Sequence, residues 1–154
     1  MFDYIKNILT HPADNNTGND SNTKKVQIAT CALFLEVANA DDNFDPREKQ
    51  HIISVMEKTF NLSAEDVKEL LQLANESMQN SVSIYEYTDV INRNFTYDEK
   101  YKILENLWRL VLVDNNLDKY EEYLLRKITN NLNLDHKDFI AAKLKVKEEL
   151  NIKN

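Results

Sequence analysis

The chain has 154 residues, of which 42% are apolar and 29% are charged, and its formal net charge is −7. This length fits one domain with a sizeable core, and a single glycine argues against all-β folds and glycine-rich nucleotide-binding loops. An acidic chain repels phosphate backbones, so we expect no nucleic acid among its partners, and cations or basic protein surfaces fit the charge better.

The first residues predict a segment separate from the main domain. Phe2, Ile5, Ile8 and Leu9 have the spacing of a short amphipathic helix. Residues 11–23, rich in Asn, Asp, Ser and Thr, predict a flexible polar linker. The sequence therefore predicts a helix and linker over residues 1–23, followed by a compact helical domain over residues 24–150.

From residue 24 onward, apolar residues recur with a helical period, which predicts an all-α single domain of about seven helices. The seven apolar stripes cover residues 26–40, 52–60, 67–78, 84–95, 101–111, 124–132 and 139–150. The first stripe is broad enough to predict a central helix, in which Cys31 is buried as a small apolar residue. N-cap sequences, with an acid three positions after the cap, begin at residues 45, 63, 96, 118 and 135.

The sequence lacks the motifs that are typical of several classes of function. No apolar run approaches the roughly 18 residues of a membrane span, and residues 1–10 lack the apolar region of a signal peptide, so we expect no transmembrane segment and a cytoplasmic location. No phosphate-binding loop, nucleophile elbow or His-Glu-x-x-His motif is present, so we do not expect an enzyme. His51 and His136 are expected to be exposed on helix surfaces.

One acidic pattern occurs twice, at residues 41–48 and at residues 114–121. Each copy reads Asp, two small polar residues, an apolar residue, Asp, two further residues and Glu, and each joins two predicted helices. The flanking helices also resemble each other, so the sequence predicts two similar helix–acidic turn–helix halves that pack face to face.

The two acidic turns have a structural interpretation. Asp45 and Asp118 stand where N-caps are expected, and Glu48 and Glu121 stand at the N3 position, where they complete a capping box. All four carboxylates would also lie at the positive end of a helix dipole.

The functional interpretation is a cation site made of the carboxylates that capping leaves unused. They are Glu36, Asp41 and Asp42 around the first turn, and Asp114 and Glu122 around the second. Hard cations take about six to eight oxygen ligands, and no Cys or His lies in either turn, so Ca²⁺ or Mg²⁺ is expected rather than Zn²⁺. The pattern lacks the loop length and the central Gly of an EF-hand, which excludes that motif.

Residues 36–44, an acidic helix end running into Ala-Asp and an apolar residue, resemble the signature of the tellurite resistance protein TerB family. Residues 110–121 are similar to the second such element of the family, and residues 131–134 look like its closing Leu-Gly-Leu segment. The resemblance implies an all-helical fold of two similar halves over residues 24–150. It also implies a non-enzymatic role in tellurite resistance and stress response, metal binding, and association with a membrane protein of the Ter system at the inner face of the membrane.

By position, the resemblance implies a set of acidic site residues, which Asp42 joins as a surplus carboxylate. They are Glu36, Asp41, Asp42, Asp45, Glu48, Asp114, Asp118 and Glu121. The Gly that follows the first Asp in the family is Asp42 in the first turn and Asn115 in the second, and both residue types tolerate a left-handed backbone. Arg109 stands opposite Glu36 in the repeat, which predicts an asymmetric site weighted to the first turn.

Two alternatives to a cation site stay open. In the first alternative, the chain is a metal-free adaptor whose acidic surface docks a basic protein partner, in keeping with its net charge. An enzyme remains an option only if the two acidic turns face each other across a pocket.

Overall fold

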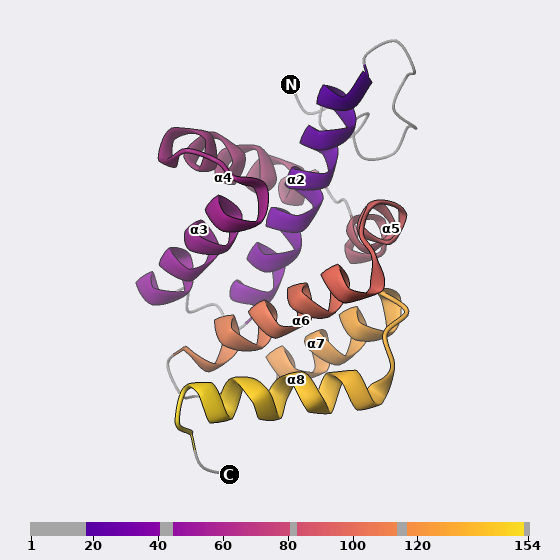
Figure 1. Cartoon of the computed structure of the whole chain (residues 1–154). Helices are drawn as coiled ribbons and strands as arrows, with labels where there is room; N and C mark the ends of the chain where they lie inside the picture. Colours follow the sequence, from indigo (N-terminus) through magenta and orange to yellow (C-terminus); the bar gives the residue numbers. More distant parts are fainter. Residues whose placement is uncertain (1–17, 41–44, 81–82, 114–116, 153–154) are drawn as a thin grey trace.

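The computed structural model describes residues 18–40, 45–80, 83–113 and 117–152, and these residues form α-helices and no strand (Figure 1). The all-α, single-domain prediction is confirmed. The helices are α2 (Gly18–Ala38), α3 (Pro46–Phe60), α4 (Ala64–Gln79), α5 (Ile84–Asn94), α6 (Tyr97–Leu112), α7 (Lys119–Asn131) and α8 (His136–Glu149).

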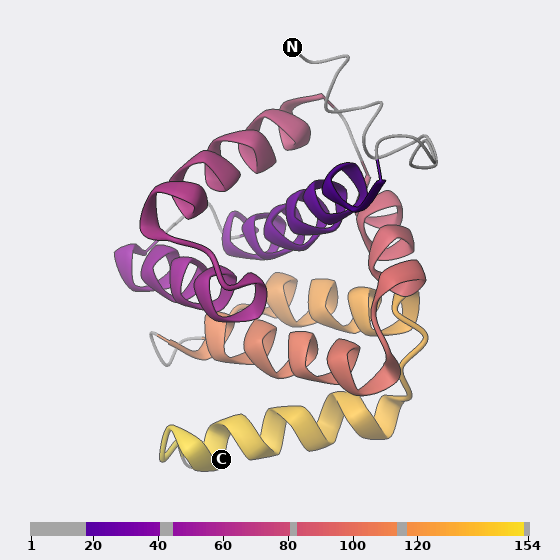
Figure 2. The same ribbon diagram turned by 45° about the horizontal axis from the view of Figure 1, so that its top comes forward.

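Helix α2 is the central helix, as the breadth of its apolar stripe predicts. It contacts α3, α4, α5, α6 and α7, and every side chain over residues 25–35 is buried, together with Val37 and Ala38. A helix that is apolar on nearly all sides needs neighbours all round, and Figure 2 shows α2 between α4, α5 and the α6/α7 pair. The buried Thr30 hydroxyl is satisfied within the helix, because it donates to the Val26 carbonyl oxygen at 2.8 Å.

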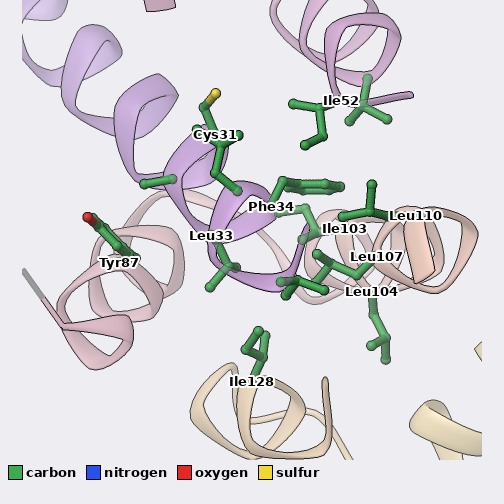
Figure 3. Close-up of a cluster of buried hydrophobic side chains, with 14 of the residues drawn as sticks. Cys31, Leu33, Phe34, Ile52, Tyr87, Ile103, Leu104, Leu107, Leu110 and Ile128 are labelled. Carbon is green, nitrogen blue, oxygen red and sulfur yellow. The ribbon is translucent and has the colours of Figure 1, made fainter. Parts of the chain in front are cut away.

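The core is continuous from α2 to α6 and α7. Phe34 of α2 lies among Ile52, Ile103 and Leu107, which come from α3 and α6 (Figure 3). Cys31 is fully buried, as predicted, and burial raises the pKa of its thiol to about 12. The thiol is therefore a packing group of the central helix rather than a reactive or metal-binding one.

Helices α6 and α7 lie between α2 and α8 (Figures 1 and 2). Trp108 of α6 and Phe139 of α8 are both buried, and their ring centroids are 5.0 Å apart. Such an aromatic pair stabilises a fold by about 0.5–1.5 kcal/mol beyond the burial of its area. Helix α8 is thereby fixed to the outer face of α6 and α7.

The two hairpins that carry the acidic turns pack against each other, because α2 contacts α6 and α7 and α3 contacts α6. Their surroundings differ, since α4 and α5 cover α2 whereas α8 covers α6 and α7. The packing of the hairpins agrees with the sequence analysis, and the similarity of the two halves as an internal repeat stays a prediction.

Helix α2 begins at Gly18, six residues before the predicted start of the domain at Lys24. Residues 18–23, which the sequence analysis assigns to the linker, are therefore helical. Their polar side chains give no apolar period, but extending an existing helix costs far less than nucleating one. The predicted N-terminal helix and the rest of the linker, residues 11–17, lie outside the described residues. Over the part of the chain that the structure describes, no helix is long and apolar enough to cross a membrane.

Candidate functional site at the acidic turns

The first acidic turn ends in a complete capping box at the start of α3. The Asp45 Oδ1 atom accepts the Arg47 backbone N–H at 2.7 Å, and the Asp45 N–H donates to Glu48 Oε1 at 3.2 Å. Pro46 occupies the first turn of the helix, where no N–H is needed. The Arg47 guanidinium pairs with Asp45 Oδ2 at 2.8 Å, and its side-chain hydrogen bond is the main cause that lowers the pKa of Asp45.

The second acidic turn ends in the same geometry at the start of α7. The Asp118 Oδ1 atom accepts the Tyr120 N–H at 2.6 Å, and the Asp118 N–H donates to Glu121 Oε1 at 3.2 Å. Glu121 and Glu48 are each only 2% exposed. The structural interpretation of Asp45, Glu48, Asp118 and Glu121 as capping residues is confirmed.

Glu36 belongs to a different environment near the end of α2. It is half-buried, and burial raises the pKa of its carboxyl group. Burial also raises the pKa of Tyr87 to about 12; the hydrogen bond with Ser77 opposes this rise, and the charges of Glu36 and Glu86 add to it. The hydroxyls of Tyr87 and Ser77 lie 2.9 Å apart. Glu36 therefore lies on the side of α2 that is close to α5.

The structure brings the predicted site residues together in pairs. Asp45 lies with Glu48 and Asp118 lies with Glu121, each pair within one helix start. Among residues 18–40, 45–80, 83–113 and 117–152, no three Asp, Glu, His or Cys side chains form a group that could hold a metal ion. Asp41, Asp42 and Asp114 lie outside the described residues. The enzyme alternative requires the two turns to face each other across a pocket, and this arrangement therefore stays untested.

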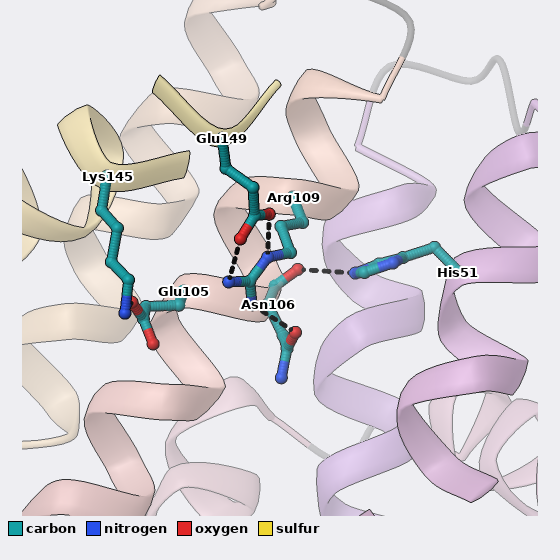
Figure 4. Close-up of polar contacts among 6 residues, drawn as sticks. All are labelled: His51, Glu105, Asn106, Arg109, Lys145 and Glu149. Carbon is teal, nitrogen blue, oxygen red and sulfur yellow. Dashed lines mark hydrogen bonds and ion pairs between the residues drawn. The ribbon is translucent and has the colours of Figure 1, made fainter. Parts of the chain in front are cut away.

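Arg109, the counterpart of Glu36 in the repeat, links α6 to α8 (Figure 4). Its Nε and Nη2 atoms donate to the two carboxylate oxygens of Glu149 at 2.7 and 3.0 Å. Its Nη1 atom donates to Asn106 Oδ1 at 2.8 Å. Arg109 thus holds a contact between α6 and α8, whereas Glu36 is a half-buried carboxyl. The asymmetric site weighted to the first turn stays a prediction.

The prediction that His51 is exposed was wrong, whereas His136 is exposed as expected. His51 is half-buried, its Nε2 lies 3.0 Å from the Asn106 carbonyl oxygen, and burial is the main cause that lowers its pKa (Figure 4). Asn106 is 55 positions away in the chain. Only the contact between α3 and α6 brings the two together, so the local sequence carried no signal for it.

A groove of about 660 Å³ lies between α2, α3 and α4. Its lining includes Asn39 and Lys49, which stand on either side of the first acidic turn in the sequence. Its apolar lining includes Leu35 of α2, Ile53 of α3, and Val67 and Leu71 of α4. Sequence reasoning missed this groove because each helix contributes only a few residues, all of which also fit an ordinary amphipathic pattern.

Comparison with protein families gives one finding that covers both turns. The family model described as tellurite resistance protein TerB matches residues 27–144, from within α2 to within α8. No curated protein and no solved structure matches the chain.

Proposed function

The chain belongs to the tellurite resistance protein TerB family, and we propose that it is a non-enzymatic stress-response protein that binds a divalent cation at its first acidic turn. The family match makes it a tellurite-resistance-associated domain. The ligands we propose first are Asp41, Asp42, Asp45 and Glu48. Glu36 and the second turn, with Asp114, Asp118 and Glu121, supply the remaining candidates.

The observation that carries the proposal is the buried carboxylate at the start of α3. Glu48 is 2% exposed and its side chain folds back to the Asp45 N–H, so its carboxylate lies against the end of the acidic turn. Asp45 adds a second carboxylate there, and Asp41 and Asp42 precede it closely in the chain. Such an oxygen-rich turn matches the ligand preference of hard cations.

Calcium or magnesium fits this chemistry better than zinc. The first turn and its helix start offer carboxylate and carbonyl oxygens, whereas Zn²⁺ sites in proteins favour Cys and His. Cys31 is fully buried in α2, and the Nε2 atom of His51 is occupied by its contact with Asn106.

The test is a calorimetric titration of the metal-stripped full chain with Ca²⁺, Mg²⁺, Mn²⁺ and Zn²⁺. We expect binding heat with Ca²⁺ or Mg²⁺ that is lost in the Asp41→Asn/Asp42→Asn variant. The matched control is Glu65→Gln/Asp66→Asn, which removes two exposed carboxylates from the first turn of α4 and should bind as the unmodified chain does. The proposal is overturned if no heat appears at millimolar metal, or if the double Asp variant gives the same heat.

A metal-free adaptor is the second candidate, and one observation favours it. All four described carboxylates of the two turns already serve helix caps, and Asp45 also pairs with Arg47 at 2.8 Å. In this case the acidic surface docks a basic partner, such as the cytoplasmic face of a membrane protein of the Ter system. In a pull-down, the amount of partner captured should fall at high salt, and it should fall with the Asp42→Asn/Glu122→Gln variant. An amount that neither change alters would contradict the adaptor.

A further inference from the structure

The groove between α2, α3 and α4 is long enough to hold a short helix. Leu35 of α2 contributes to its lining between α3 and α4, which provide Ile53 on one side and Leu71 on the other. The residues of α4 along the groove run from Ala64 to Asn75, a length of about 16 Å, or three helical turns. Amphipathic helices commonly bind with their apolar face in an apolar groove of this kind.

The charged residues that line the groove are positive, opposite in sign to the net charge of the chain. Lys49 of α3 and Lys68 of α4 line it, and no acidic residue does. Both lysines are exposed, and within the described residues neither forms an ion pair. On a chain with a net charge of −7, two lysines on facing walls create a local attraction for negative charge.

We propose that this groove binds an amphipathic helix of a partner protein, whose apolar stripe is flanked by Asp or Glu. The apolar stripe would cover Leu35, Ile53 and Leu71, and the flanking acids would approach Lys49 and Lys68. This inference goes beyond the proposed function, because the acidic partner helix that it names is distinct from the basic partner of the adaptor, and it does not depend on the cation site.

The predicted N-terminal helix of the chain is a less favourable occupant. Its apolar stripe includes Phe2, Ile5 and Ile8, but Lys6 borders that stripe on the helix surface. Docking it would bring a third positive charge toward Lys49 and Lys68. The acidic helix of a partner has no such conflict.

The test uses the full chain and two synthetic peptides of about 14 residues with identical apolar faces. One peptide carries Glu at the flanking positions and the other carries Lys. Fluorescence anisotropy measures the affinities, and methyl NMR of Leu35, Ile53 and Leu71 locates the bound peptide. We expect the Glu peptide to bind at least about tenfold more tightly at low salt, with the difference shrinking at high salt.

Charge reversal supplies the matched variants. Lys49→Glu/Lys68→Glu should invert the preference, whereas Lys127→Glu, at an exposed position on α7, should leave it unchanged. Because all three lysines are exposed, the variants should keep the fold, which circular dichroism verifies. Calcium titration of Lys68→Glu, whose position on α4 lies outside the acidic turn, should match the unmodified chain, so failure of peptide binding and failure of cation binding are told apart.

Four results would overturn the inference. They are the absence of Glu-peptide binding at millimolar concentration, equal affinity for the two peptides, methyl shifts confined to residues outside the groove, and tighter binding of a peptide of residues 1–17 than of the Glu peptide. The last result would assign the groove to the chain's own N-terminal segment.

Discussion

The starts of α3 and α7 are the same structure built twice, whereas the helices that precede them differ in chemistry. In both starts an Asp side chain accepts a backbone N–H two residues on, at 2.7 or 2.6 Å, and its own N–H donates to a buried Glu at 3.2 Å. Four residues suffice for this cap. Both copies of the pattern form it, although different helices pack around them.

The preceding helices show the opposite behaviour. Glu36 of α2 is half-buried near α5 with a raised pKa, and Arg109 of α6 is paired with Glu149 of α8. Each environment depends on a helix that has no equivalent in the other half. Local sequence thus determines the repeated part, and tertiary packing determines where the surroundings of the two halves differ.

The largest expected effect comes from the central helix. Phe34→Ala should lower the free energy of unfolding by about 3–5 kcal/mol, because it removes a fully buried ring and leaves a cavity. Urea denaturation followed by circular dichroism measures the loss. Tyr85→Ala, at a ring that is 69% exposed, is the control and should change little; a small effect of Phe34→Ala would contradict the central role of α2.

The equivalence of the two caps is tested next. Asp45→Ala and Asp118→Ala should each cost about 1 kcal/mol of unfolding free energy, because each removes an N-cap acceptor. Asn at either position should restore most of the loss, since Asn is also a good N-cap. Thermal or urea unfolding of the two Ala variants measures the two losses of stability. Clearly unequal losses would show that the two caps are not equivalent.

A smaller effect is expected at Arg109. Arg109→Gln should lower the free energy of unfolding by about 0.2–1 kcal/mol, because the ion pair with Glu149 is partly exposed. Glu149→Gln should cost a similar amount, and the double variant should cost less than the two losses added together. Additive losses in urea denaturation would show that the pair contributes nothing as a pair.

The mildest change is expected in the pH profile of Glu36→Gln. Because the folded pKa of Glu36 is raised, its contribution to stability is complete below the unfolded pKa and is lost as pH rises through the folded pKa. The unmodified metal-free chain should therefore lose stability relative to Glu36→Gln over a pH range that begins near the ordinary Glu pKa of about 4.3 and extends upward. Thermal unfolding across this range measures the difference, and parallel profiles would contradict it.

The parts of the molecule that sequence predicted are those governed by neighbours in the chain. The caps at Asp45 and Asp118 need four residues, and the central position of α2 follows from the breadth of one apolar stripe. The early start of α2 was missed, because polar residues extend a helix without leaving an apolar period. The burial of His51 and the groove beside Ile53 were missed for another reason, since both require helices that meet only in the fold.

The burial of Cys31 gives the chain its own reporter of local opening. It is the single cysteine, it lies in the middle of α2 with no exposed surface, and its thiol stays protonated at neutral pH. An alkylating reagent can therefore reach it only when α2 separates from the helices around it. The rate of labelling measures how often the centre of the molecule opens, and whether a cation or a partner helix holds it closed.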